Sequence, residues 1–138
     1  MKSKHAKLKT KAWDLLSLCI RLERSDCNGM VKCVTCQKVL YWKGQGMQAG
    51  HAIKGRGNYI LFNELYIHPQ CKTCNIFNGG EYTRFAIYLL EKRIVTRKKL
   101  KEDEIKSRLP YPLKDYMLEE KIKEYKERLA KELKKRGF

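Results

Sequence analysis

The sequence CVTC at positions 33–36 and the sequence CKTC at positions 71–74 decide the fold of this 138-residue chain. In a Cys-x-x-Cys pair the two thiolates can point at one centre, and two such pairs supply the four sulfur ligands that a structural zinc takes. The predicted ligands are Cys33, Cys36, Cys71 and Cys74. The six cysteines also fit three disulfides in a secreted protein. We favour zinc, because the pair is repeated and the basic N-terminus lacks the apolar stretch of a secretory signal.

The segment between the cysteine pairs has the order of a small nuclease site. Residues 48–53 are expected to form a strand that carries His51, and residues 59–68, which are rich in β-formers, pair back after a basic loop. The second pair is followed at once by Asn75, and a helix is predicted at about 81–93. This order describes a ββα-metal, or HNH, nuclease site. We therefore predict an α+β fold with a zinc-stapled ββα-metal (HNH-like) core and helices at both ends.

Few groups are needed for the chemistry of such a site. A neutral imidazole can take a proton from the attacking water near pH 7. A hard cation neutralises the charge that builds on the phosphoryl and leaving oxygens. Magnesium accepts oxygen ligands and needs only one or two protein groups, and manganese is an alternative. A single histidine and one or two oxygen donors therefore suffice in a small domain.

Three runs of the chain resemble the lambda NinG (Rap) family of phage recombination endonucleases. They are Gln48-Ala49-Gly50-His51, Phe62-Asn63-Glu64 and His68-Pro69-Gln70-Cys71-Lys72-Thr73-Cys74-Asn75. The resemblance extends from about Leu15 to the C-terminal helix, and the arrangement is also similar to phage endonuclease VII. It implies that His51 is the general base and Asn75 a magnesium ligand. It also implies a structure-selective DNA endonuclease that cuts branched recombination intermediates, Holliday junctions above all.

Position 50 departs from endonuclease VII and many HNH enzymes, in which an aspartate precedes the histidine and binds the metal. The residue here is Gly50, as in the NinG-like motif, so the second oxygen ligand is open. Glu64 is the first candidate, because it is the only carboxylate between the cysteine pairs. His68 is the next, as a ligand or as a partner that orients the base. Gln48 shares a strand face with Gly50, which leaves it room, and Asn63 is a candidate for fixing the ring of the base.

The functional assignments have structural alternatives. His51 taken alone fits an ordinary strand histidine, and Asn75 fits a cap of the following helix. Lys54 and Arg56, in the basic loop, are expected to contact phosphates rather than to act as catalytic groups.

The charge of the chain predicts a polyanionic partner. Its formal net charge is +16, from 31 Lys+Arg against 15 Asp+Glu, which fits either nucleic acid or an anionic membrane surface. The membrane surface is the weaker alternative, because the basic residues are spread along the chain and no strongly apolar amphipathic face accompanies the lysine-rich start. No apolar run is long enough to cross a membrane, and membrane binding is not expected. We expect a cytoplasmic protein, located in the host cell if it is phage-encoded.

The chain divides into three predicted parts: a basic N-terminal tail over 1–11, the nuclease core with its N-terminal helix over 12–95, and a charged helical extension over 96–138. The extension includes a long helix at about 113–135 with a narrow apolar stripe. The stripe consists of Leu118, Ile122, Tyr125, Leu129 and Leu133. It is expected to pack on the domain or to pair with a second copy, since symmetric cutting of a four-way junction needs two active sites.

Two other functions fit parts of the pattern. A generic HNH nicking endonuclease fits the site, although no separate specificity domain is present. A non-catalytic zinc module that binds DNA fits the charge and the cysteines, but leaves the placement of His51 and Asn75 unexplained.

Overall fold

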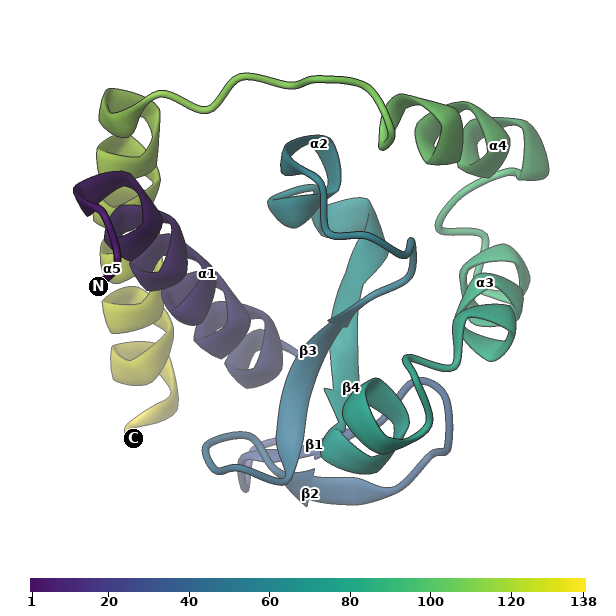
Figure 1. Cartoon of the computed structure of the whole chain (residues 1–138). Coiled ribbons are helices and arrows are strands. Elements are labelled where there is room, and N and C mark those ends of the chain that lie inside the picture. Colours follow the sequence, from purple (N-terminus) through teal and green to yellow (C-terminus); the bar gives the residue numbers. More distant parts are fainter.

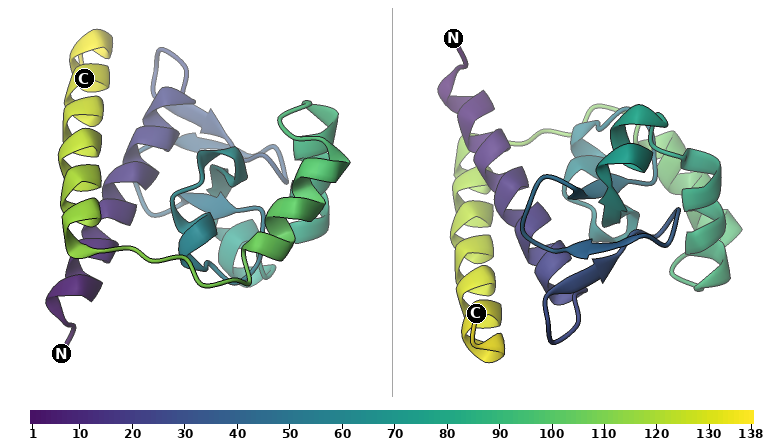
Figure 2. Two further views of the ribbon diagram at one scale, coloured as in Figure 1. Left: turned by 90° about the horizontal axis from the view of Figure 1, so that it is seen from above. Right: turned by 90° about the horizontal axis from the view of Figure 1, so that it is seen from below.

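The computed structural model describes residues 1–138 and confirms a small α+β protein with helices at both ends (Figure 1). Its elements are α1 (Lys4–Glu23), β1 (Met30–Lys32), β2 (Val39–Tyr41), β3 (Met47–His51), α2 (Asn58–Leu61), the 3-10 turn η1 (Glu64–Tyr66), β4 (Ile67–Cys71), the π-helical turn η2 (Thr73–Phe77), α3 (Tyr82–Glu91), α4 (Arg97–Lys106) and α5 (Asp115–Arg136). The views from above and below place α1 and α5 on one flank of β3 and β4, and α3 and α4 on the other (Figure 2). None of these helices combines the length and apolar character that a membrane crossing needs.

The antiparallel sheet of β3 and β4 positions the predicted site. Its register pairs Gly50 with His68 and His51 with Ile67. Residues that face each other across an antiparallel ladder point to the same side of the sheet, and the side alternates along each strand. His51 therefore lies on the side of α1, where Ala49 and Ile67 pack in one core cluster with α1 residues. Gly50 and His68 lie on the opposite side, toward α3.

The second strand begins later than the sequence predicts. The expected strand over 59–68 is mostly α2 and η1, and β4 starts only at Ile67. The Asn63 side chain accepts a hydrogen bond from the Leu65 amide at 3.3 Å. Such a local bond favours a turn over a strand ladder. The β-forming residues of this segment thus enter the core from turns rather than from a strand.

The first helix begins earlier than the sequence predicts. The helix expected from Ala12 starts at Lys4, and Ser3 caps it by accepting a hydrogen bond from the Ala6 amide at 3.1 Å. Most of the segment expected as a basic tail over 1–11 is therefore the first part of α1. Leu8 and Ala12 pack with residues of α5, a partner that lies more than 100 positions away in the chain.

Helix α5 uses its apolar stripe inside the monomer. Leu118, Ile122 and Tyr125 are buried and share core clusters with residues of α1. Burial of each such side chain contributes about 1.5–3 kcal/mol. The stripe that was a candidate contact for a second copy is thus already covered by α1, and a homodimer stays a prediction that would need another surface.

The C-terminal extension is also anchored at α4. Asp103 is completely buried, and its carboxylate accepts hydrogen bonds from the hydroxyls of Tyr59 and Tyr66, the first at 2.7 Å. Lys99 adds an ion pair at 3.3 Å. These charge-assisted bonds tie α4 to the segment between β3 and β4.

Candidate active site

The four predicted zinc ligands meet in one cluster. The sulfur atoms of Cys33, Cys36, Cys71 and Cys74 all lie within 4.8 Å of one another. Cys33 follows β1, Cys71 ends β4 and Cys74 lies in η2. Four thiolates at this spacing could hold a zinc ion in a closed structural site. The cluster fixes the end of β4 against η2 and thereby places the residue that follows Cys74.

The thiols of this cluster differ in their protonation. Burial raises the pKa of the Cys33 thiol, but hydrogen bonds from Thr35 and from backbone amides outweigh it and bring that pKa to about 6. Burial raises the pKa of the Cys74 thiol to about 12, and the nearby Cys71 and Cys36 sulfurs add to the rise. At neutral pH the Cys33 thiol is therefore mostly ionised, whereas the Cys74 thiol keeps a proton that a bound divalent cation would displace.

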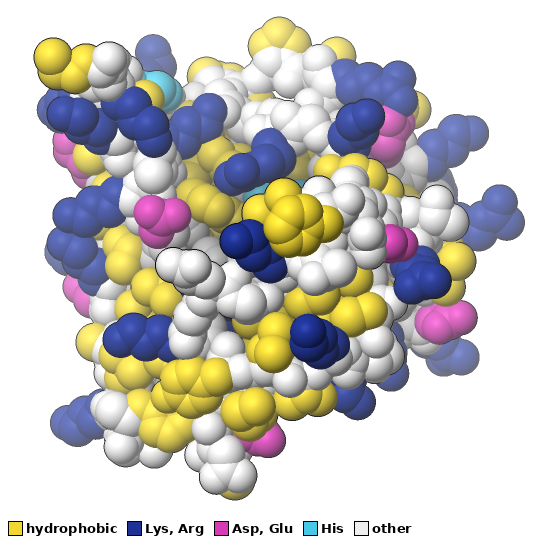
Figure 3. All heavy atoms as spheres, turned by 60° about the horizontal axis from the view of Figure 1, so that its bottom comes forward, with side chains coloured by type: hydrophobic (Ala, Val, Ile, Leu, Met, Phe, Trp, Pro, Cys, Tyr) yellow, Lys and Arg dark blue, Asp and Glu magenta, His cyan; other side chains and the backbone are white.

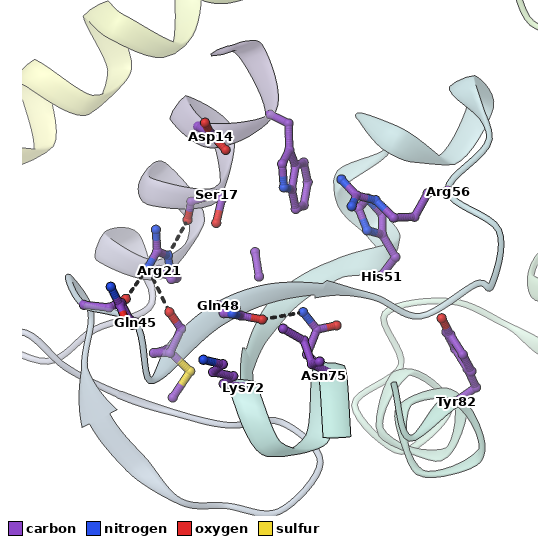
Figure 4. Close-up of a pocket in the computed structure, with 15 residues that line it drawn as sticks. Asp14, Ser17, Arg21, Gln45, Gln48, His51, Arg56, Lys72, Asn75 and Tyr82 are labelled. Atoms are coloured by element: carbon purple, nitrogen blue, oxygen red, sulfur yellow. Dashed lines mark hydrogen bonds between the residues drawn. The ribbon is translucent and has the colours of Figure 1, made fainter. Parts of the chain in front are cut away.

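A pocket of about 680 Å³ opens between α1, β3 and η2 (Figure 4). It brings together His51, Arg56 and Asn75, three residues that the sequence singled out. The remaining wall is mostly polar. It includes Trp13, Asp14, Ser17, Arg21, Gln45, Gln48, Lys72 and Tyr82.

His51 is held in the pocket wall with one ring nitrogen committed to the backbone. Its ring stacks on Trp13 of α1 with centroids 4.5 Å apart, and its Nε2–H donates to the Leu61 carbonyl at 3.2 Å. Because a carbonyl only accepts, this bond puts the proton on Nε2 and leaves the lone pair on Nδ1. Nδ1 has no protein partner and is not buried, so it is accessible from the pocket. The Leu61 carbonyl thus fixes the ring, whereas Asn63, the candidate for that task, caps η1 instead.

The surroundings of His51 keep its imidazole neutral. Burial lowers its pKa, the hydrogen bond to Leu61 opposes this, and the nearby Arg56 charge lowers it further, to about 4. The ring is 6% exposed. At neutral pH it is therefore a proton acceptor at Nδ1.

Asn75 offers its carbonyl oxygen to the same pocket. Its Nδ2 donates to Gln48 Oε1 at 2.8 Å, and its oxygen points away from Gln48 (Figure 4). Asn75 lies inside η2 rather than at the start of α3, whose N-cap is Glu81. The alternative role as a helix cap is therefore wrong, and the oxygen is free for a ligand.

A family model described as Bacteriophage Lambda NinG protein matches residues 2–136. The chain belongs to the NinG family. No curated protein and no solved structure matches it.

In this NinG family member, Glu64 does not reach the pocket. Its carboxylate accepts two hydrogen bonds from Arg128 of α5, at 2.7 and 3.0 Å, and Arg128 also pairs with Glu23. A carboxylate engaged in this way, outside the pocket lining, is poorly placed to bind magnesium with Asn75. Its position instead links η1 to α5.

His68 lies on the side of the sheet opposite to His51 and does not line the pocket. Its ring packs edge-on against Phe85 and Tyr88 of α3, and its Nε2–H donates to the Leu65 carbonyl at 2.8 Å. Burial lowers its pKa to about 4. This placement indicates a core histidine rather than a ligand or an orienting partner of the base.

Of the two residues predicted to contact phosphates, only Arg56 lines the pocket. The Arg56 guanidinium lies over the Trp13 ring, 5.1 Å from its centroid, and lines the pocket. Lys54 is exposed in the same loop and lies outside the pocket lining.

Helix α1 supplies one wall of the pocket, which the sequence reasoning did not foresee. Trp13, Ser17 and Arg21 recur at four-residue steps on one face of the helix, a spacing that marks them as neighbours. Arg21 is almost completely buried and donates to the carbonyls of Ser17, Trp42 and Met47. These bonds hold the loop before β3 in place. No carboxylate pairs with Arg21, so its positive charge remains at the pocket. The four-residue spacing of these side chains is a feature of the sequence from which this face of the helix could have been predicted.

Proposed function

We propose that this NinG family member is a metal-dependent DNA endonuclease of the HNH type that cuts branched recombination intermediates such as Holliday junctions. The observation that carries the proposal is the pocket that His51 and Asn75 share. One contributes a neutral imidazole with an accessible Nδ1, and the other contributes a free carbonyl oxygen. A general base beside an oxygen donor for a hard cation is the minimum that phosphodiester hydrolysis requires.

In the proposed mechanism His51 Nδ1 accepts a proton from the water that attacks the phosphorus. The Nε2–H bond to Leu61 and the stack on Trp13 hold the ring in one orientation while the charge develops. The new P–O bond forms as the bond to the leaving oxygen breaks, and the resulting oxyanion takes up a proton from solvent. General base catalysis of this kind contributes about 10²–10⁴-fold.

The donor set fits magnesium, with manganese as a substitute. Asn75 has a free carbonyl oxygen in the pocket, and Gln70, which faces Gln48 across the ladder, has a buried carbonyl oxygen without a partner. Oxygen donors with room for several waters match the preference of magnesium, whereas the cysteine cluster matches zinc. When bound, magnesium supplies positive charge against the phosphoryl and leaving oxygens.

Positive charge around the pocket supports a phosphate-bearing substrate. Arg21, Arg56 and Lys72 line the pocket, and Asp14 is its one carboxylate. Lysines and arginines spread across the face shown in Figure 3, whereas acidic side chains form isolated spots. Together with the net charge of +16, this distribution favours an extended polyanion such as DNA. The preference for branched DNA is supported by family membership and by the resemblance of the site to endonuclease VII.

The test compares an end-labelled four-way junction with a linear duplex of the same sequence, using zinc-replete protein with magnesium or without any added magnesium. His51→Ala is the active-site variant, and His5→Ala is the matched control, because His5 is paired with Asp115 away from the pocket. We expect junction cutting by wild type and His5→Ala, and none by His51→Ala or without magnesium. Equal cutting of both DNAs would indicate a generic HNH nicking enzyme. Tight binding without cutting would contradict the proposal in favour of a zinc-stapled binding module.

A further inference from the structure

The space beside Gly50 is already filled by an oxygen from the neighbouring strand. A Cβ built on Gly50 would lie 2.0 Å from Gln70 Oε1 and 3.0 Å from Gln70 Cδ. The backbone of Gly50 is outside the positive-φ region, so its conformation does not require glycine. Glycine is needed here for space. Gln48, which was expected to use that room, turns to Asn75 instead.

The Gln70 amide is fixed with its nitrogen turned away from Gly50. Its Nε2 donates to the Gly80 carbonyl at 2.8 Å and to the Thr35 hydroxyl at 3.2 Å. Because the Gly80 carbonyl only accepts, the amide cannot be reversed without losing that bond. The side chain is 0% exposed, and Oε1 is buried without any hydrogen-bond partner. Buried carbonyl oxygens are rarely left unpaired, so this atom is available to a ligand.

This oxygen belongs to the side of the sheet that carries Asn75. Gln70 stands directly opposite Gln48 in the ladder, and Gln48 holds the Asn75 amide. Gly50, against which Oε1 lies, directly precedes the base His51 in the chain. Carboxamides from β3, β4 and η2 therefore gather on one side of the sheet, opposite to the His51 ring, and the Gln70 amide lies behind the pocket lining rather than in it.

Neither Glu64 nor Asp14, the one carboxylate in the pocket lining, offers a better donor. Glu64 is engaged by Arg128 outside the pocket. Asp14 lines the pocket from α1, on the opposite side from Asn75 (Figure 4).

We propose that Gln70 Oε1 is the second protein oxygen ligand of the catalytic metal, in place of a side chain at position 50. This inference rests on the proposed function and names the donor that completes its metal site. Gly50 and Gln70 then form a reciprocal pair, in which the missing side chain on β3 makes room for the oxygen from β4. Neutral carboxamide oxygens are acceptable ligands for magnesium and manganese.

The test measures Mn²⁺ binding to zinc-replete protein without DNA, by electron paramagnetic resonance. Asn75→Ala defines the signal that belongs to the pocket. Gln70→Ala, and Gln70→Met of similar volume, should weaken that binding at least tenfold, with zinc content and circular dichroism unchanged. Gly50→Asp alone should also bind poorly, because its Cβ meets Gln70 Oε1. The double variant Gly50→Asp/Gln70→Ala should bind Mn²⁺ at least as tightly as wild type, because the carboxylate then occupies the vacated space.

A structural role for Gln70 does not predict rescue by aspartate on the other strand. If folded Gln70→Met binds Mn²⁺ like wild type, or if the double variant binds no better than Gln70→Ala, the inference is wrong. If wild type cuts junctions in magnesium but binds no Mn²⁺ at the pocket, the inference is also wrong and the proposed function stands. If wild type neither binds Mn²⁺ nor cuts, both are wrong.

Discussion

His51 and His68 sit near one end of the same two-stranded sheet, on its opposite sides, and by most measures they are alike. Both are almost completely buried, at 6% and 1% exposure, and burial lowers both pKa values to about 4. Both donate Nε2–H to a nearby backbone carbonyl. They differ in Nδ1, which reaches the pocket in His51 and is buried without a partner in His68. Burial and pKa therefore do not distinguish the proposed base from the core histidine, whereas the direction of the free lone pair does.

The largest expected effect that separates the two histidines is on cleavage. His51→Ala should lower junction cleavage about 10²–10⁴-fold, because the proton acceptor is lost. Single-turnover assays on labelled junction measure this directly. His68→Ala, compared at equal concentrations of folded protein, should cut within a few-fold of wild type. A comparable loss in both variants would break the distinction between the two sides of the sheet.

The next largest effect is on stability, and here His68→Ala should be the more damaging of the two variants. His68→Ala removes a ring packed against Phe85 and Tyr88 and should destabilise the fold by about 2–4 kcal/mol. His51→Ala opens onto the pocket, where water can enter, and should cost less. Urea denaturation at fixed zinc concentration gives both free energies of unfolding. A His68→Ala variant as stable as wild type would argue against its role in the core.

The two histidines should contribute equally to the pH dependence of the free energy of unfolding. The folded pKa of each, about 4, lies below the ordinary value of 6.5, so the unfolded chain binds protons first as the pH falls. The contribution of each neutral ring is complete above pH 6.5 and is lost as the pH falls toward 4. Between pH 7 and pH 5 we expect a loss of about 2 kcal/mol per histidine. Denaturation of His51→Gln and His68→Gln across this range should each show part of the wild-type slope removed, and an unchanged slope would contradict the assignment for that residue.

The smallest effect concerns Arg56, which lowers the pKa of His51 and has no such effect on His68. Arg56→Met should raise the pKa of His51 by roughly half a pH unit and leave that of His68 unchanged. Titration of both ring signals by NMR measures the difference. If Arg56 contacts a phosphate as proposed, its loss should also raise the KM for DNA with little change in kcat. Equal shifts at both histidines would indicate a general change in the fold rather than a local charge effect.

The local parts of the site were predictable because their determinants are close in sequence. Two cysteines three positions apart favour one knuckle in almost any context, and the sequence placed His51 near the end of a strand and Asn75 next to a ligand. The start of α1 was missed because Leu8 and Ala12 gain their apolar partners only from α5. The turns of α2 and η1 do not follow from the sequence, because the β-propensity of this segment predicts a strand. The hydrogen bond of Asn63 that favours a turn is visible only in the structure.

The sequence by itself determined which residue types were available: four thiolates for zinc, a histidine, an asparagine beyond the second cysteine pair, and a strongly basic surface. Only the tertiary structure decided how they are used. In the structure, Glu64 pairs with Arg128 of α5, His68 packs in the core, and Trp13 of α1 stacks on His51. Gln70 Oε1 also occupies the space that Gly50 leaves. Those choices depend on contacts between elements far apart in the chain, which local periodicity and spacing do not encode.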